Sequence, residues 1–103
     1  MTVTEWFFPP DHPASQGHFP GNPVIPGAVL LRDALRAIEK DGGLTLPRCR
    51  IQSAKFLHPV RPGDRIMIEC SRNADGDVRF ACRIGARLVL TGQVRCHAVP
   101  SAD

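Results

Sequence analysis

The spacing of apolar residues differs between the middle and the second half of this chain, and that difference limits the folds available to it. Between residues 28 and 40 the apolar residues recur at helical spacing, whereas from residue 48 onward they alternate at a period of two. Turn-forming sequences, RPGD, NADGD and Gly85, divide the alternating part. The predicted strands are residues 48–60, 64–72, 77–84 and 86–98. One helix and a run of strands predict an α+β domain with an antiparallel sheet.

Residues 2–8 alternate in the same way and predict an opening strand, which gives a sheet of five or six strands. In the segment 77–84 the apolar residues fall on one face and the arginines on the other. We therefore expect one face of the sheet to pack against the helix and the other to be wetter. The exposed edges of such a sheet favour a homodimer, in which two chains pair edge to edge.

The predicted helix begins after Gly27 and ends near Lys40, where the sequence DGG follows it. A wide apolar flank and a narrow polar stripe indicate that other elements largely enclose this helix. The flank consists of Leu30, Leu31, Ala34, Leu35, Ala37 and Ile38, and the stripe of Arg32, Asp33, Arg36, Glu39 and Lys40.

Composition excludes several classes of protein. A length of 103 residues, 43% of them hydrophobic, predicts a single globular domain over 1–103, with a frayed tail at 99–103. The net charge of +3 does not imply a nucleic-acid partner. No apolar run is long enough for a membrane span and the start does not resemble a signal peptide, so we expect a cytoplasmic protein.

The four cysteines lie far apart, without a CxxC or CxxH pair. This spacing gives no local support for a zinc site or a redox pair. Each cysteine falls in an apolar-alternating stretch, so we expect four buried free thiols and no metal. The cysteines are Cys49, Cys70, Cys82 and Cys96.

The segment GHFPGNPVIPGAVLL, residues 17–31, holds His18 in a run of prolines and glycines just before the helix. Together with KFLHPVRPGDRIMIE at 55–69, it resembles the hot dog fold dehydratases, the beta-hydroxyacyl-acyl carrier protein dehydratases of fatty acid synthesis. The resemblance extends from about Phe8 to the last strand. It implies a hot dog fold, in which the sheet wraps one long helix, with active sites at a dimer interface.

The resemblance also implies site residues. His18 would be the base that removes the C2 proton, and the backbone amide of Gly27 would bind the thioester oxygen as an enolate develops. Phe19, Pro26 and Arg32 would lie around the bound substrate. The substrate would be a thioester of acyl carrier protein or coenzyme A, and the reaction would use no cofactor.

The resemblance implies that His18 works with an acidic residue on the central helix of the other protomer. The sequence departs from the family at this acidic residue, which stands five positions after the glycine that begins the helix. Arg32 occupies that position and Asp33 follows it. One step rotates a side chain by about 100°, so Asp33 replaces the acid only if the first turn is unwound or bulged. Asp33 is therefore either the acid or a solvated helix residue that pairs with Arg36. Arg32 can bind a phosphate, a carboxylate or, through a water, the departing hydroxyl.

Three functions remain open from the sequence. The leading one is a 3-hydroxyacyl thioester dehydratase with His18 and Asp33 as candidate catalytic residues. The second is a non-catalytic or half-catalytic subunit, which forms a heterodimer with a chain that supplies the acid. The third is a thioesterase, since the same fold hosts that reaction. Three other histidines, His12, His58 and His97, are expected in surface or turn roles.

Overall fold

The computed structural model of the protein describes residues 2–9, 24–40, 49–73 and 76–96. These ranges contain one helix and five strands, as the periodicity predicts. The elements are β1 (Thr2–Phe7), α1 (Gly27–Lys40), β2 (Cys49–Phe56), β3 (Arg65–Arg72), β4 (Asp77–Ile84) and β5 (Arg87–Cys96). The predicted loop at 9–15, the helix stop at 41–43 and the tail at 99–103 lie wholly or mostly outside the described residues.

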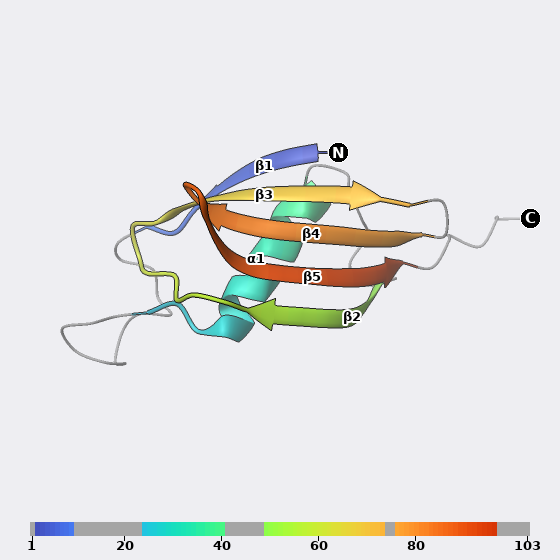
Figure 1. The fold of residues 1–103 in the computed structure, drawn as a ribbon, viewed down its shortest axis with the longest axis horizontal. Helices are drawn as coiled ribbons and strands as arrows, with labels where there is room; N and C mark the ends of the chain where they lie inside the picture. Colours follow the sequence, from blue (N-terminus) through green and yellow to red (C-terminus); the bar gives the residue numbers. More distant parts are fainter. Residues whose placement is uncertain (1, 10–23, 41–48, 74–75, 97–103) are drawn as a thin grey trace, which may run out of the picture.

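The five strands form one antiparallel sheet in the order β1-β3-β4-β5-β2. The first strand after the helix, β2, therefore lies at one edge, and β1 lies at the other. Helix α1 crosses behind a single face of this sheet (Figure 1). The prediction of an α+β domain is thus confirmed for the described residues.

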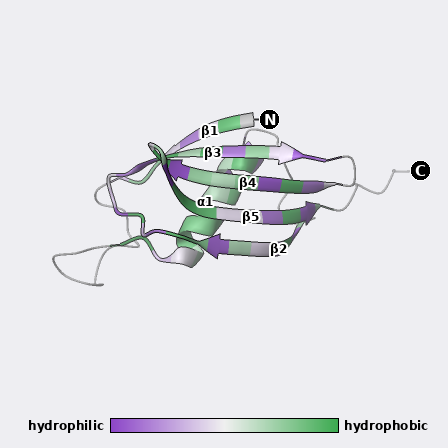
Figure 2. Ribbon diagram, viewed as in Figure 1, coloured by the Kyte–Doolittle hydropathy of each residue, from purple (hydrophilic) through white to green (hydrophobic). Residues whose placement is uncertain are grey.

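The core lies between α1 and the face of the sheet that the helix covers. In β4 the alternation is as predicted, because Val78, Phe80 and Cys82 are buried while Arg79 is exposed. Hydrophobic and hydrophilic segments alternate along the strands in Figure 2. On α1 the buried side chains are Leu30, Asp33, Ala34, Leu35, Ala37 and Ile38. The apolar flank is therefore confirmed, with Leu31 only partly buried.

The turn at RPGD joins the end of the β2 segment to β3. The amide of Asp64 donates to the carbonyl of Arg61 at 3.0 Å, and Gly63 has a φ of 96°. Proline at the second position and a positive φ at the third are the requirements of a type II turn. The Asp64 side chain also accepts from the amide of Arg61 at 2.8 Å, so this predicted turn is confirmed as a structural feature.

The expectation of four free thiols is wrong for two of the cysteines. Cys49 and Cys96 form a disulfide, whereas Cys70 and Cys82 are free and buried. The bonded pair lies 47 residues apart in sequence. They meet because β2 pairs with β5 in a register that sets Cys49 directly opposite Cys96. Sequence spacing contains no information about that register.

Asp77, the first residue of β4, joins its strand to both neighbours through an ion pair with Arg95 of β5 and a hydrogen bond to Asn73 at the end of β3. Asp77 accepts from Arg95 at 2.8 and 3.2 Å, and its amide donates to the side chain of Asn73 at 3.0 Å. These contacts hold the pKa of the Asp77 carboxyl below its usual range, with the hydrogen bond from Arg95 as the largest cause.

This lowered pKa predicts the behaviour of Asp77 in acid. A carboxyl with a depressed folded-state pKa stabilises the fold above its unfolded pKa, and that contribution is lost as the pH falls below about 4. We therefore expect the wild type to lose more unfolding free energy than Asp77→Asn when the pH falls from about 5 to about 3, that is, across the usual pKa of an Asp carboxyl. Urea titrations at both pH values measure the difference. An equal loss in the two proteins would contradict the role of this pair.

Candidate functional site

The candidate site is a cavity at the N-terminus of α1, with a volume of about 260 Å³. Two stretches far apart in sequence form its wall, one at the start of the helix and the other at the end of β2. The residues that line it are Ile25, Gly27, Leu30, Phe56, Leu57, His58, Pro59 and Val60. Most of these side chains are apolar, so the cavity suits a hydrocarbon chain.

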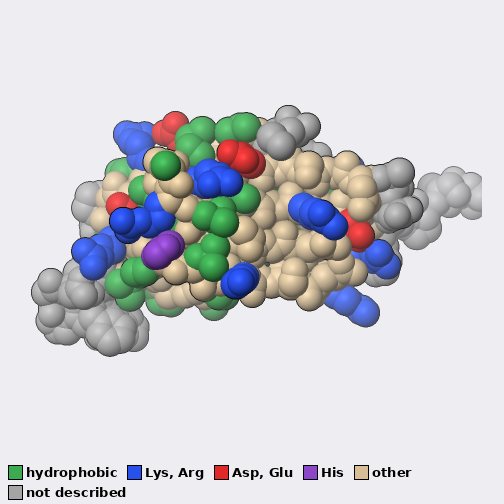
Figure 3. All heavy atoms as spheres, in the orientation of Figure 1, with side chains coloured by type: hydrophobic (Ala, Val, Ile, Leu, Met, Phe, Trp, Pro, Cys, Tyr) green, Lys and Arg blue, Asp and Glu red, His purple; other side chains and the backbone are tan. Residues whose placement is uncertain are grey.

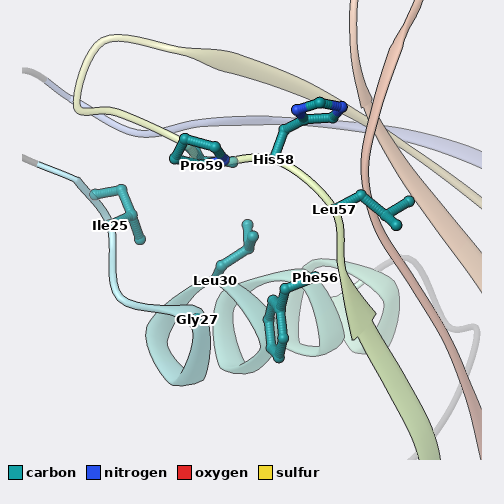
Figure 4. Close-up of a pocket in the computed structure, with 8 residues that line it drawn as sticks. Ile25, Gly27, Leu30, Phe56, Leu57, His58 and Pro59 are labelled. Carbon is teal, nitrogen blue, oxygen red and sulfur yellow. The ribbon is translucent and has the colours of Figure 1, made fainter.

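Backbone pairing brings the two stretches together. The amide of Ile25 donates to the carbonyl of Val60 at 2.7 Å, which fixes the chain entering α1 against the segment leaving β2. Ile25 and Val60 are both buried. Figure 4 shows Ile25, Leu30 and Pro59 around the space beyond the first helical turn, while the His58 ring points away from Gly27.

The first turn of α1 presents backbone amides at this cavity. The carbonyl of Pro26 accepts from the amides of Val29 and Leu30, both at 3.0 Å, so the helix begins directly after Pro26. The amide of Gly27 precedes these bonds and has no acceptor within the helix. The first turn contains no acidic residue, so no carboxylate there offsets the positive end of the helix dipole. This end of the cavity therefore favours an oxygen that gains negative charge.

Gly27 allows the ring of Phe56 to lie directly against the helix. A Cβ at position 27 would come within 3.1 Å of the ring, which is closer than an ordinary van der Waals contact. Phe56 is 49% exposed, so only part of its ring is covered by the described residues. The ring forms the outer wall of the cavity beside Gly27 (Figure 4).

Arg32 and Asp33 lie one turn further along α1 and do not line the cavity. Asp33 is only 5% exposed, so the alternative of a solvated helix residue is wrong. The Nε atom of Arg32 donates to Oδ1 of Asp33 at 3.1 Å, and the Arg32 side chain is 51% exposed. Residues Gly27–Lys40 form a continuous α-helix, without the unwound turn that would bring Asp33 to the azimuth of Arg32.

Of the other predicted site residues, Pro26 is exposed at the helix start, beside the cavity but outside its lining. His18 and Phe19 lie outside the described residues.

The remaining histidines were expected in surface or turn roles. His12 and His97 lie outside the described residues, whereas His58 is exposed, as expected, and contributes to the cavity wall.

Sequence reasoning missed most of the cavity wall. Ile25 and Leu30 follow helix and core patterns that carry no signal for a site. Phe56, Pro59 and Val60 belong to the motif FLHPVRPGD. The motif that supported the resemblance therefore contained wall residues that were not predicted as such. The motif did not show that this segment packs against Gly27.

Comparisons with known proteins agree with this architecture. The model of the family described as "ApeI-like: ApeI dehydratase" matches residues 1–93. A 3-hydroxyacyl-(acyl-carrier-protein) dehydratase FabZ from Lactobacillus helveticus is 32% identical over 91% of this chain and 66% of its own length. The FabZ from Koribacter versatilis is 31% identical over 97% of this chain and 67% of its own. The chain thus spans about two thirds of the length of these relatives.

Solved structures share the fold. The dehydratase heterocomplex ApeI:P from Xenorhabdus doucetiae matches with a TM-score of 0.73 and 19% identity, over 92% of this chain and 86% of the other. A fluoroacetyl-CoA-specific thioesterase FlK matches with a TM-score of 0.64 and 13% identity, over 93% and 87%. At these identities the likeness concerns the fold alone, and it confirms the predicted hot dog fold.

Proposed function

Because the chain belongs to the ApeI-like dehydratase family, we propose that it removes water across C2 and C3 of a 3-hydroxyacyl thioester. The observation that supports this most strongly is the apolar cavity that opens at the amide end of α1. An acyl chain would occupy the space beside Leu30 and Phe56. The thioester oxygen would then lie at the amide of Gly27.

The reaction needs three groups. A base takes the proton from C2, an enolate develops on the thioester oxygen, and the C3 hydroxyl leaves as water after it receives a proton. We assign the base to His18, whose neutral imidazole can accept a proton near pH 7. We assign the oxyanion contact to the amide of Gly27, aided by the helix dipole.

Of the three groups, the proton donor to the leaving hydroxyl is the one for which a single chain offers the weakest candidate. Asp33 was the candidate acid, but its carboxylate is buried within its own chain and accepts a hydrogen bond from Arg32. We therefore assign Asp33 to holding the half-exposed guanidinium of Arg32. The donor in this proposal comes from a second chain, which faces the cavity across a dimer interface.

Among the described strands, β1 and β2 lie at the edges of the sheet, and β2 is the edge strand whose last residue lines the cavity. Ile51 and Phe56 are each 49% exposed on β2, and the cavity wall continues directly from its last residue. Pairing of two β2 edges would cover these side chains and close the cavity between chains. We propose this edge as the interface of a homodimer or a heterodimer.

Basic side chains surround the neighbouring end of the sheet. Arg61 and Arg87 line a second, more polar cavity together with Asp64, and this cavity shares Pro59 with the wall of the first. Lys and Arg side chains gather at this end of the face away from α1, near the turn from β4 to β5 (Figure 3). Guanidinium groups bind phosphate and carboxylate well, so they would suit the phosphate of coenzyme A or the acidic surface of acyl carrier protein.

Arg32 favours a second candidate function, a half-catalytic subunit. Its position is the one at which the family resemblance places the acid, and an arginine cannot donate a proton at ordinary pH. A heterodimer in which the partner supplies a carboxylate would restore the donor. The related ApeI:P structure is described as a heterocomplex.

The products of the reaction, measured with and without a second chain, distinguish these functions. The purified protein is incubated with 3-hydroxyacyl thioesters of coenzyme A and of acyl carrier protein, and the enoyl product and the free thiol are quantified. Enoyl thioester from this chain alone supports the dehydratase. Enoyl product only after addition of a second hot dog chain supports the half-catalytic subunit, and free thiol without enoyl product would contradict both.

In the described ranges the structure contains no helix with the length and apolar character that a membrane span requires. We propose a cytoplasmic location on the basis of the proposed substrate, a carrier-bound thioester of fatty acid synthesis. Disulfides in that compartment are usually transient or redox-sensing. The Cys49–Cys96 bond therefore calls for a specific explanation.

A further inference from the structure

The disulfide between Cys49 and Cys96 joins the edge strand β2 to the rest of the sheet. Cys49 is the first residue of β2 and Cys96 is the last residue of β5, and their Cα atoms lie 4.0 Å apart. Both residues are partly buried rather than enclosed in the core. The bond thus lies at one end of the β2–β5 ladder.

Within a single chain, β2 is less buried than the central strands. None of its eight residues is buried, whereas four of the eight residues of β4 are. Among the described strands β2 pairs with β5 alone, and the register of that pairing shifts between Ile51 and Ser53. Strands with little buried apolar surface and irregular pairing open more readily than central strands.

The same strand carries the outer wall of the proposed site. Its last residue, Phe56, lies against Gly27, and residues 56–60 line the cavity. At about 3.3 Å per residue, the seven steps from Cys49 to Phe56 span about 23 Å. The disulfide and the cavity wall therefore lie at opposite ends of one strand.

The chemistry of the four cysteines separates this pair from the other two. Cys70 and Cys82 are buried free thiols, and burial raises the pKa of Cys82 to about 12. Cys49 and Cys96 lie at the ends of their strands and are only partly buried, so they differ from the two core thiols in exposure. The thiolate is the reactive form in thiol–disulfide exchange.

We propose that Cys49–Cys96 is a reversible thiol–disulfide switch that controls the order of β2 and, through Phe56, the outer wall of the cavity. In the reductive step, the thiolate of a small thiol such as glutathione attacks one sulfur of the bond and forms a mixed disulfide. The other protein sulfur leaves as a thiolate and takes a proton. A second glutathione then releases oxidised glutathione, so the protein gains two electrons and two protons. Oxidised glutathione reverses these steps.

Hydrogen exchange read by mass spectrometry tests the effect on the strand without any substrate. The wild-type protein is equilibrated with oxidised or reduced glutathione, and alkylation confirms whether two more thiols are free. We expect exchange of β2 amides to become at least about tenfold faster on reduction and to recover on reoxidation, while β3 and β4 change little. Equal exchange of β2 in the two states would overturn the proposal.

The double variant Cys49→Ser with Cys96→Ser is the matched control. It should exchange rapidly over β2 in both glutathione buffers, and a response to reductant like that of the wild type would also overturn the proposal. The effect on turnover rests on the proposed function, but the effect on β2 does not. A β2 response without dehydratase activity in either state supports the switch and contradicts only the proposed function. Turnover that stays unchanged while β2 responds would overturn the link to the cavity.

Discussion

Replacement of His18 by alanine should lower kcat for enoyl formation by about 10²- to 10⁴-fold, the usual contribution of a positioned general base. The expectation follows from the assigned role of the imidazole in removing the C2 proton. Since the base acts on bound substrate, KM should change much less than kcat. Steady-state kinetics with a 3-hydroxyacyl thioester measure both quantities.

His12→Ala is the matched control for this prediction. His12 lies in the segment before His18 and is expected to have a surface or turn role. Its replacement should leave kcat within about twofold of the wild type, as for most surface substitutions away from a site. Equal activity of His18→Ala and the wild type would remove His18 from the mechanism.

Replacement of Gly92 by alanine should lower the free energy of unfolding by about 3 kcal/mol, the upper range for overpacking a core. Gly92 lies in β5 opposite Phe80 of β4 and Ala54 of β2. An added Cβ would press against the Phe80 ring and lie 2.8 Å from the carbonyl oxygen of Ser53. Phe80 is 3% exposed, so its ring has little room to move.

Urea unfolding compares this variant with Gln93→Ala on the same strand. The Gln93 side chain makes an exposed hydrogen bond to Gln52 at 2.8 Å. Its loss should therefore change the unfolding free energy by less than about 1 kcal/mol. If Gly92→Ala were as stable as Gln93→Ala, the close approach of Phe80 to β5 would not be a constraint on the sheet.

The arrangement of elements could be predicted from the sequence because each element carries its own local signal. Apolar residues at helical spacing located α1, and alternation with turn residues located β2 through β5. The predicted segment 77–84 coincides with β4. These signals depend on neighbours within a few residues, which a sequence displays directly.

Features that depend on pairing between distant segments could not be predicted. The Cys49–Cys96 bond depends on the register of β2 against β5. The burial of Asp33 depends on what packs over that part of α1, and its position at the edge of the polar stripe gave no sign of it. The cavity wall likewise depends on the contact between Ile25 and Val60.

The site itself was predicted in part. The resemblance identified Gly27, and the structure places it at an apolar cavity. It also identified the position of the family's acid, where Arg32 stands instead. An arginine at this position can be recognised from the sequence, but its hydrogen bond to a buried carboxylate requires the folded helix.

A crystal structure with a stable 3-hydroxyacyl amide, in which nitrogen replaces the thioester sulfur, tests the central claim most directly. The proposal predicts the amide carbonyl oxygen within about 3.2 Å of the Gly27 nitrogen, the acyl chain between Leu30 and Phe56, and the His18 ring beside C2. A carbonyl bound away from the first turn of α1, with the cavity left empty of the acyl chain, would contradict it.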